Sequence, residues 1–294
     1  MGIMAKPMQC IINRRSEFAA GHRYWLKELS ELENFKRFGP TANFPGHGHN
    51  YVLFVSLIGD IDQYGMVDNL SYVKRVIEKE IINDLNFSFL NQVWPEFQQT
   101  LPTTENIARV IWHRLESHLR LHNIQLFESP NLWADYRGQA MQASLSIQTH
   151  FSAAHRLALP HLEQSENEAI YGKCARVNGH GHNYHLEVTV TGEINPRTGM
   201  LIDLVEFEKV VKDYIVEPMD HTFLNYDLDY FATTVPTAEN IALYIAETLN
   251  APIAALGAKL EKVKLIESPN NSAEILCQSL GSQVLQTQQK VTFC

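Results

Sequence analysis

The chain has 294 residues, of which 45% are apolar and 19% are charged, and its formal net charge is -9. This length accommodates two domains of ordinary size, and the composition is typical of a globular protein. The negative charge and the lack of a long basic run argue against a nucleic-acid-binding function. Every apolar stretch is much shorter than the roughly twenty residues of a membrane-spanning helix, so we expect no membrane association.

The cysteines and the first residues indicate a cytoplasmic protein. Cys10, Cys174, Cys277 and Cys294 are scattered and form no C-x-x-C pair, a pattern of reduced thiols. The opening sequence MGIMAKPMQCII has no sustained apolar run and no small-residue cleavage site. We therefore predict no secretory signal.

One set of short motifs occurs twice, in the same order. Six such landmarks exclude coincidence, so the chain is a tandem duplication. We place its two domains at residues 1–139 and 140–294, hereafter the first and second repeats. The matching segments are Glu17–Arg23 with Phe151–Arg156, Gly46–Tyr51 with Gly179–Tyr184, Gly65–Asp68 with Gly199–Asp203, Phe89–Asn91 with Phe223–Asn225, Pro102–Ala108 with Pro236–Ala242, and Phe127–Asn131 with Ile266–Asn270.

Each repeat is predicted to begin with two strands. In the second repeat, residues 145–155 alternate loosely, so that Phe151, Ala153 and His155 share one face. A loop of about two dozen residues follows. The next strand covers residues 182–190, which alternate and end in β-branched side chains.

Two helices and two further strands complete the repeat. Apolar residues at helical spacing predict a helix over about 204–217. A second helix opens at Pro236-Thr237, with Thr237 as its N-cap. Short strands over 263–267 and 272–277 close the repeat. The connection between the repeats, over 136–142, is short, so we expect the two repeats to form one continuous assembly. We assign no role to the polar tail over 280–294.

Three histidines recur at identical spacing in both repeats. The early histidine precedes an H-G-H motif by 25 positions each time, and two strand residues two apart point to one face. Neutral imidazoles suit Zn²⁺, and three protein ligands leave a fourth position for water or substrate. Histidines beside glycine can also merely line a turn, but the repeated third histidine favours a metal site. The predicted ligands are His155, His180 and His182 in the second repeat, and His22, His47 and His49 in the first.

Together these motifs resemble the 6-pyruvoyltetrahydropterin synthase family, which includes the 6-carboxytetrahydropterin synthases of the queuosine pathway. The resemblance covers nearly all of residues 145–278 and, more weakly, residues 10–137. It implies an α+β fold: a tandem T-fold whose two units each have a four-stranded antiparallel sheet and two helices on one face. Sheets of this family join edge to edge into barrels with pockets at subunit interfaces, which implies a homo-oligomer. The segments that carry the resemblance to the family are Phe151–Leu157, Cys174–Tyr184, Asp220-His221, Pro236–Asn240 and Glu267–Pro269.

The resemblance also implies a reaction. The family's substrate is 7,8-dihydroneopterin triphosphate, which loses triphosphate while a histidine-bound zinc acidifies a C–H bond of its side chain. Carried onto this chain, the base is Cys174 and the proton relay is Asp220 with His221. Glu267 accepts hydrogen bonds from the pterin ring, and Thr237 lies near the same pocket. Glu128 is the ring-binding counterpart in the first repeat.

Each of these residues also has a purely structural interpretation. Cys174 can be a small buried side chain, and Asp220-His221 can end the helix near Met219. Glu267 can be a surface residue. For these residues the family pattern favours the functional interpretation. For Thr237 the helix start is favoured over a ligand role, although pockets of the family lie near that turn.

The first repeat departs from that pattern at all three proton-handling positions. Thr41 stands at the position of the cysteine, and Asn86 and Phe87 stand where the second repeat has Asp220 and His221. We interpret the first repeat as catalytically degenerate, because losing a general base and its relay costs on the order of 10² to 10⁴ in rate. Metal binding and ring binding remain open for it.

The product and the class of function have alternatives. Five residues separate Cys174 from His180-Gly-His182, which resembles the pyruvoyl-forming members, whereas carboxy-forming members more typically show three. The tandem layout departs from both types, so either product stays open. A non-catalytic pterin-binding or scaffold protein of the same fold is the alternative. An unrelated zinc hydrolase is disfavoured, since neither repeat has an H-E-x-x-H motif.

Overall fold

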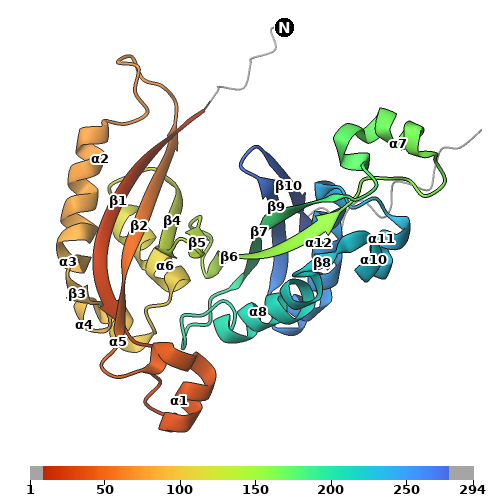
Figure 1. Ribbon diagram of the computed structural model, residues 1–294. Coiled ribbons are helices and arrows are strands. Elements are labelled where there is room, and N and C mark those ends of the chain that lie inside the picture. The colour runs from red at the N-terminus through yellow and green to blue at the C-terminus, as the bar shows by residue number, and fades with distance from the viewer. Residues whose placement is uncertain (1–8, 278–294) are drawn as a thin grey trace, which may run out of the picture. The chain divides into compact units, whose positions relative to one another are not determined.

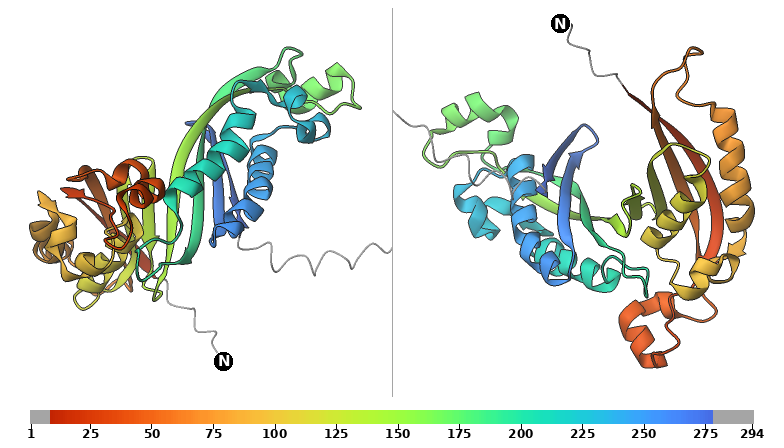
Figure 2. Two further views of the ribbon diagram at one scale, coloured as in Figure 1. Left: turned by 90° about the horizontal axis from the view of Figure 1, so that it is seen from below. Right: turned by 180° about the vertical axis from the view of Figure 1, so that it is seen from behind.

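The computed structural model describes residues 9–277. Contacts divide these residues into two compact units, one made of residues 9–146 with 191–205 and the other of residues 147–190 with 206–277. Within the described range, no helix is long and apolar enough to cross a membrane. Figure 1 and Figure 2 show that each unit consists of long strands with helices packed beside them.

Unit 1 has a sheet of antiparallel strands in the order β5-β4-β2-β1, and the short strand β3 joins β1 in parallel. The helical run from α2 to α3 contacts β1, and α6 contacts β4, β5 and the π turn η2. The elements are β1 (Cys10–His22), α1 (Glu31–Phe38), the 3₁₀ turn η1 (Gly39–Ala42), β2 (His47–Gly59), α2 (Leu70–Ile77), the π turn η2 (Glu78–Ile82), α3 (Asn83–Leu85), β3 (Ser88–Phe89), α4 (Leu90–Val93), α5 (Pro95–Gln99), α6 (Thr104–Leu115), β4 (Leu121–Ser129) and β5 (Leu132–Tyr136).

Unit 2 repeats this arrangement with strands in the order β10-β9-β7-β6, and β8 pairs in parallel with β6. Helix α12 contacts β9, β10 and the π turn η4. The elements are β6 (Gln142–His155), α7 (Gln164–Tyr171), the 3₁₀ turn η3 (Gly172–Ala175), β7 (His180–Glu193), α8 (Leu204–Val211), the π turn η4 (Lys212–Val216), α9 (Glu217–Met219), β8 (Thr222–Phe223), α10 (Leu224–Asp227), α11 (Asp229–Thr233), α12 (Ala238–Ala255), β9 (Lys259–Ser268) and β10 (Asn271–Leu276).

The α+β class and the T-fold order of elements are confirmed. The strands predicted over 145–155 and 182–190 lie inside β6 and β7, and the helix predicted over 204–217 continues to Met219. Thr237 is the N-cap of α12, because its hydroxyl accepts a hydrogen bond from the Asn240 N–H at 3.3 Å. The predicted loop after the first strand contains a helix and a 3₁₀ turn in both repeats. Cys294 and the 280–294 tail lie outside the described residues.

Strand alternation aligns the histidines with the hydrophobic core. On β2, the buried Tyr51, Leu53 and Val55 share a face with His47 and His49. Strand β1 pairs antiparallel with β2, and its face through Phe18 and Ala20 ends at His22, opposite His47. The three imidazoles therefore extend the core at one end of the sheet. Unit 2 has the same register, with the face formed by Phe151, Ala153 and His155 on β6 and by His180, His182, Tyr184 and Leu186 on β7.

Gly179 allows the beginning of the H-G-H strand β7 to lie close to the end of β6. Gly179 has φ +65°, and a Cβ there would lie 2.6 Å from the carbonyl oxygen of His155 and 2.6 Å from Cζ of Phe223. Any side chain at this position would push β7 away from β6. The glycine before the first H-G-H motif, Gly46, is equally close to the carbonyl of His22, at 2.6 Å.

Replacing this glycine is expected to be far more damaging than replacing a matched one. Gly179→Ala should lower the free energy of unfolding by about 2 kcal/mol or more, because backbone strain and a steric clash add. The control is Gly172→Ala: its φ is +58°, but nothing lies within 4 Å of the new Cβ, so only the left-handed conformation costs, about 1 kcal/mol. Urea unfolding of both variants checks this, and equal losses would contradict it.

Candidate metal centres and their surroundings

Each unit brings its three predicted histidines together at the end of the sheet. In unit 2, Nε2 of His155 lies 3.1 Å from Nε2 of His180, and the corresponding distance from His22 to His47 in unit 1 is 3.0 Å. His182 and His49 complete the two groups, whose ligand atoms all lie within 4.8 Å of one another. Two nitrogens on one tetrahedral zinc lie roughly 3.3 Å apart, so both clusters have the dimensions of a metal site.

A backbone carbonyl orients the deeply buried histidine of each cluster. Nδ1 of His155 donates to the carbonyl of Pro236 at 2.7 Å, and Nδ1 of His22 donates to the carbonyl of Pro102 at 3.1 Å. A carbonyl can only accept, so it fixes the proton on Nδ1 and leaves the Nε2 lone pair directed at the cluster. Both prolines immediately precede the threonine that begins the following long helix.

Burial keeps these imidazoles neutral. It lowers the pKa of His22 and the pKa of His155 to about 4, with the neighbouring histidines adding to the effect. Burial also lowers the pKa of His47, His49 and His180. Neutral imidazole is the form that binds metal, so these histidines are ready to act as ligands at neutral pH.

Buried nitrogens without partners support the same conclusion. Nε2 of His49, Nε2 of His182 and Nδ1 of His47 are buried and have no hydrogen-bond partner. A buried polar atom left unpaired is costly, and a bound metal ion would satisfy the two Nε2 atoms. Among the described residues, each repeat therefore contains a cluster that can hold a metal ion.

A carboxylate lies beside each cluster. Alternation on β9 places Glu267 on the face of Val263 and Leu265. Its Oε1 lies 3.7 Å from Nε2 of His182 and 3.9 Å from Nε2 of His155. The counterpart Glu128 on β4 lies closer, with Oε1 3.3 Å from Nε2 of His49.

The predicted relay residues form a direct pair in unit 2. Nδ1 of His221 donates to Asp220 Oδ2 at 2.8 Å, and Asp220 Oδ1 accepts from the N–H of Ser152 at 2.8 Å. The Ser152 N–H and the His221 side chain both lower the pKa of Asp220, so it stays ionised. The backbone of His221 is left-handed, with φ +58°, and its imidazole is 82% exposed. The geometry therefore presents Nε2 of His221 to solvent.

Cys174 lies in the 3₁₀ turn η3 as a half-buried free thiol. Its carbonyl accepts from the N–H of Leu157 at 2.9 Å, which ties the turn to the residues just after His155. The turn that contains the sequence-predicted base is thus linked by a backbone hydrogen bond to the residue two positions after His155.

Unit 1 has the same scaffold with different side chains. The N–H of Tyr24 donates to the carbonyl of Thr41 at 3.1 Å, and the Thr41 hydroxyl donates to the Phe38 carbonyl at 2.6 Å. Asn86 Oδ1 accepts from the N–H of Ala19 at 3.0 Å, the role that Asp220 has in unit 2. Phe87 has φ +57°, nearly the value of His221. These contacts support the assignment of Thr41, Asn86 and Phe87 to the three proton-handling positions.

The beginning of helix α6 is covered by a turn of the second repeat, which sequence patterns did not reveal. The Thr103 hydroxyl donates to the carbonyl of Gly199 at 2.5 Å, and the N–H of Leu201 donates to Oε1 of Glu105 at 2.8 Å. Met200 packs into an apolar cluster with Tyr24 and its neighbours. Burial raises the pKa of Glu105 to about 7. The residues that meet this turn, Thr103 and Glu105, have the same residue types at their counterparts Thr237 and Glu239, so comparing the repeats gives no signal of the contact.

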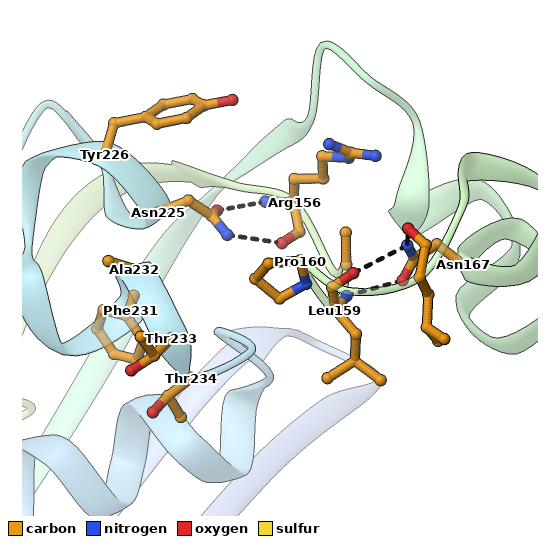
Figure 3. A pocket seen from close by; sticks show the side chains of 12 residues that line it. Arg156, Leu159, Pro160, Asn167, Asn225, Tyr226, Phe231, Ala232, Thr233 and Thr234 are labelled. Atoms are coloured by element: carbon orange, nitrogen blue, oxygen red, sulfur yellow. Dashed lines mark hydrogen bonds between the residues drawn. The ribbon is translucent and has the colours of Figure 1, made fainter.

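A cavity of about 210 Å³ in unit 2 is lined by Arg156, the residue after His155, and by none of the predicted site residues. Figure 3 shows that Asn225 holds the backbone of Arg156 there, accepting from its N–H at 2.8 Å and donating to its carbonyl at 3.0 Å. Asn167 binds the backbone of Leu159 in the same way. Because Arg156 follows His155 directly, these amides brace the strand end that carries the histidine.

Comparison with known proteins gives a single family for both repeats. The family model described as 6-pyruvoyl tetrahydropterin synthase matches residues 11–139 and again residues 144–277. Together the two matches account for most of the chain.

Each individual relative matches a part of this chain about as long as one repeat. The 6-pyruvoyl tetrahydrobiopterin synthase of Homo sapiens is 45% identical over 134 residues, which are 46% of this chain and 91% of the human protein. A putative 6-carboxy-5,6,7,8-tetrahydropterin synthase of Archaeoglobus fulgidus is 33% identical over 131 residues, which are 45% of this chain and 93% of that protein. The solved 6-pyruvoyl tetrahydropterin synthase of Caenorhabditis elegans is 36% identical and has a TM-score of 0.44, covering 47% of this chain and 96% of its own.

Proposed function

Because the chain belongs to the 6-pyruvoyl tetrahydropterin synthase family, we propose that its second repeat is a zinc-dependent lyase. The proposed substrate is 7,8-dihydroneopterin triphosphate, which would lose triphosphate to give 6-pyruvoyl- or 6-carboxy-tetrahydropterin. One observation carries this proposal: Cys174, the Asp220–His221 pair and a three-histidine cluster occur together in the second repeat. We also propose that the repeats are domains at residues 1–139 and 140–294.

His155, His180 and His182 would hold the zinc, which as a Lewis acid would polarise the hydroxyls of the substrate's side chain. Their Nε2 lone pairs converge, and the carbonyl of Pro236 prevents His155 from turning away. The protein thus provides a fixed three-nitrogen face with room for a substrate oxygen.

Proton transfer would fall to the remaining three residues. Cys174 would accept the acidified proton from the substrate carbon as a thiolate and later return a proton. Asp220, held by the N–H of Ser152, would keep the Nδ1 proton of His221 in place, so that Nε2 exchanges protons with solvent. The strained backbone of His221 supports this role, since left-handed non-glycine residues cluster at functional sites.

Glu267 would accept hydrogen bonds from pterin ring N–H groups, and Thr237 would lie at the edge of the same pocket. Glu267 has no hydroxyl donor from the positions that correspond to Tyr24 and Thr104, where the second repeat has Leu157 and Ala238. Its carboxylate thus keeps hydrogen-bonding capacity for a ligand.

The alternative is a non-catalytic pterin-binding or scaffold protein of the same fold. A binding protein needs neither a base nor an Asp–His pair, and the second repeat has both. Half-buried free thiols at Cys10, Cys174 and Cys277 support the proposal of a cytoplasmic location.

The decisive experiment incubates zinc-loaded protein with 7,8-dihydroneopterin triphosphate and identifies the products. Triphosphate release with acetaldehyde would identify the carboxy-forming reaction. Triphosphate release with a pyruvoyl product would identify the other. Absence of turnover by zinc-loaded protein would contradict the lyase proposal and favour the binding protein.

Cys174→Ala should abolish turnover while zinc content stays at the wild-type level. The thiol would carry the proton, whereas the metal would be held by histidines alone. A loss of at least 10²-fold in kcat is expected for a missing general base. The matched control is Cys277→Ala. Cys277 is also a half-buried thiol, but it lies just after β10, and its variant should keep wild-type kcat. A Cys174→Ala variant with undiminished kcat would assign the proton transfer to another group.

The start of helix α12 indicates how the second site is completed. The first-repeat counterparts at the start of α6 are almost fully buried, with Thr103 at 2% and Glu105 at 3% exposure. In the second repeat Thr237 is only half-buried and Glu239 is exposed. The difference is the covering turn, residues 198–202, which lies over α6.

We propose that a second copy of the chain supplies the corresponding cover for α12. The first-repeat turn that matches residues 199–203 is Gly65–Asp68, and it is exposed: Tyr64 is 75% and Met66 is 39% accessible. By analogy with unit 1, Thr237 would donate to the carbonyl of the partner's Gly65. The resulting homo-oligomer would place the second-repeat pocket at a boundary between copies.

Met66→Glu should therefore weaken the oligomer, because a charge would enter an apolar contact equivalent to that of Met200. Met66 is partly exposed within one chain, so the variant should fold normally. The control is Leu32→Glu, at a residue that is 79% exposed on α1. Sedimentation at equal concentrations should show a lower mass for Met66→Glu alone. Unchanged mass for both variants would contradict the proposed interface.

A further inference from the structure

The two clusters differ in how close the glutamate carboxylate lies: Glu128 Oε1 is 3.3 Å from Nε2 of His49, whereas Glu267 Oε1 is 3.7 Å from Nε2 of His182. In the first repeat the group of mutually close donor atoms has four members, since a Glu128 oxygen lies within 4.8 Å of the nitrogens of His22, His47 and His49. In the second repeat the corresponding group contains the three histidines alone. The Glu128 Oε1 to His49 Nε2 distance of 3.3 Å matches the ligand spacing of a tetrahedral zinc, roughly 3.3 Å.

The protein holds Glu128 in this position with two hydroxyl groups. The Thr104 hydroxyl donates to Oε2 of Glu128 at 2.6 Å, and the Tyr24 hydroxyl also hydrogen-bonds the carboxylate. The Glu128 side chain is only 6% exposed. With Oε2 occupied, Oε1 remains directed toward the histidines. Leu157 and Ala238 replace the two donors in the second repeat, so Glu267 has no equivalent support.

In unit 1 the space beside Tyr24 and Thr104, the hydroxyl partners of Glu128, is filled. The turn over residues 198–202 brings Met200 against Tyr24, and the N–H of Leu201 binds Glu105. What is left between Tyr24, Thr104, Glu105 and Met200 is a cavity of about 10 Å³, enough for at most one water molecule. Binding sites for small molecules typically measure roughly 300 Å³ or more, so a pterin does not fit there.

We infer that the first repeat is a closed, structural metal site in which His22, His47, His49 and Glu128 supply all four ligands. Such four-ligand sites stabilise folds, whereas a three-ligand site keeps a position open for chemistry. The inference rests on the metal binding proposed above, and it replaces the ring-binding role that the sequence suggested for Glu128. The chain then has one structural and one reactive metal.

Cobalt substitution tests whether each site is closed. Two Co²⁺ ions per chain are expected, and azide should change the visible spectrum of only one of them, because only an open position admits an external ligand. The His180→Ala/His182→Ala variant keeps the first site alone and should show no response to azide. The His47→Ala/His49→Ala variant keeps the second site alone and should show the full response.

Matched glutamate variants test the fourth ligand. Glu128→Gln should weaken metal binding at one site by roughly 10- to 100-fold and lower the thermal midpoint of the metal-loaded protein. Glu267→Gln should leave both metal affinities unchanged. Both substitutions preserve side-chain shape, so both variants are expected to fold and their metal affinities can be compared directly.

The inference is overturned if the first site responds to azide, if it takes up no metal, or if Glu128→Gln retains wild-type metal affinity. Failure of the proposed function has a different signature. In that case the second site would stay open to azide, or empty of metal, without turnover, while the first site would still bind one unresponsive ion.

Discussion

The hydrogen bond from a buried histidine to a proline carbonyl joins the parts of each repeat. It links His22 to Pro102 and His155 to Pro236, connecting the end of the first strand to the residue just before the long helix. Because that strand end is buried, the bond forms out of water, and burial keeps the imidazole neutral. One contact therefore links the sheet, the helix start and the histidine cluster, and any shift of the helix start would move a candidate metal ligand.

Divergence between the repeats has affected the surroundings of the clusters more than the clusters themselves. Both keep three histidines and a glutamate on equivalent strand positions. Around Glu128 the first repeat has a tyrosine, a threonine and a covering turn, which close the site. In the second repeat Leu157 and Ala238 stand at the positions of that tyrosine and threonine, and the repeat also contains Cys174 and an Asp–His pair. Under the proposals above, one scaffold would thus carry a structural centre and a reactive one.

The sequence was sufficient to predict the strands, the long helices and the histidine clusters, because strand alternation and internal repetition are local patterns. It also identified Thr41, Asn86 and Phe87 as replacements. It could not predict that residues 198–202 cover the first repeat, because that contact joins segments almost one hundred positions apart. For the same reason the separate environments of Glu128 and Glu267 appeared only when the strands, helices and turn were assembled.

Phe87 has the same backbone conformation as His221 but a different side chain. Its φ of +57° is unusual for a bulky residue, and its N–H donates to the carbonyl of Ala19 at 2.6 Å just as that of His221 does to Ser152. The phenylalanine ring is 89% exposed. The first repeat thus bears a conformational cost of about 1 to 2 kcal/mol at a position where its side chain has no polar group. The same left-handed turn is therefore present in both repeats, and the side chain at this position, rather than the backbone, decides whether an imidazole is presented to solvent.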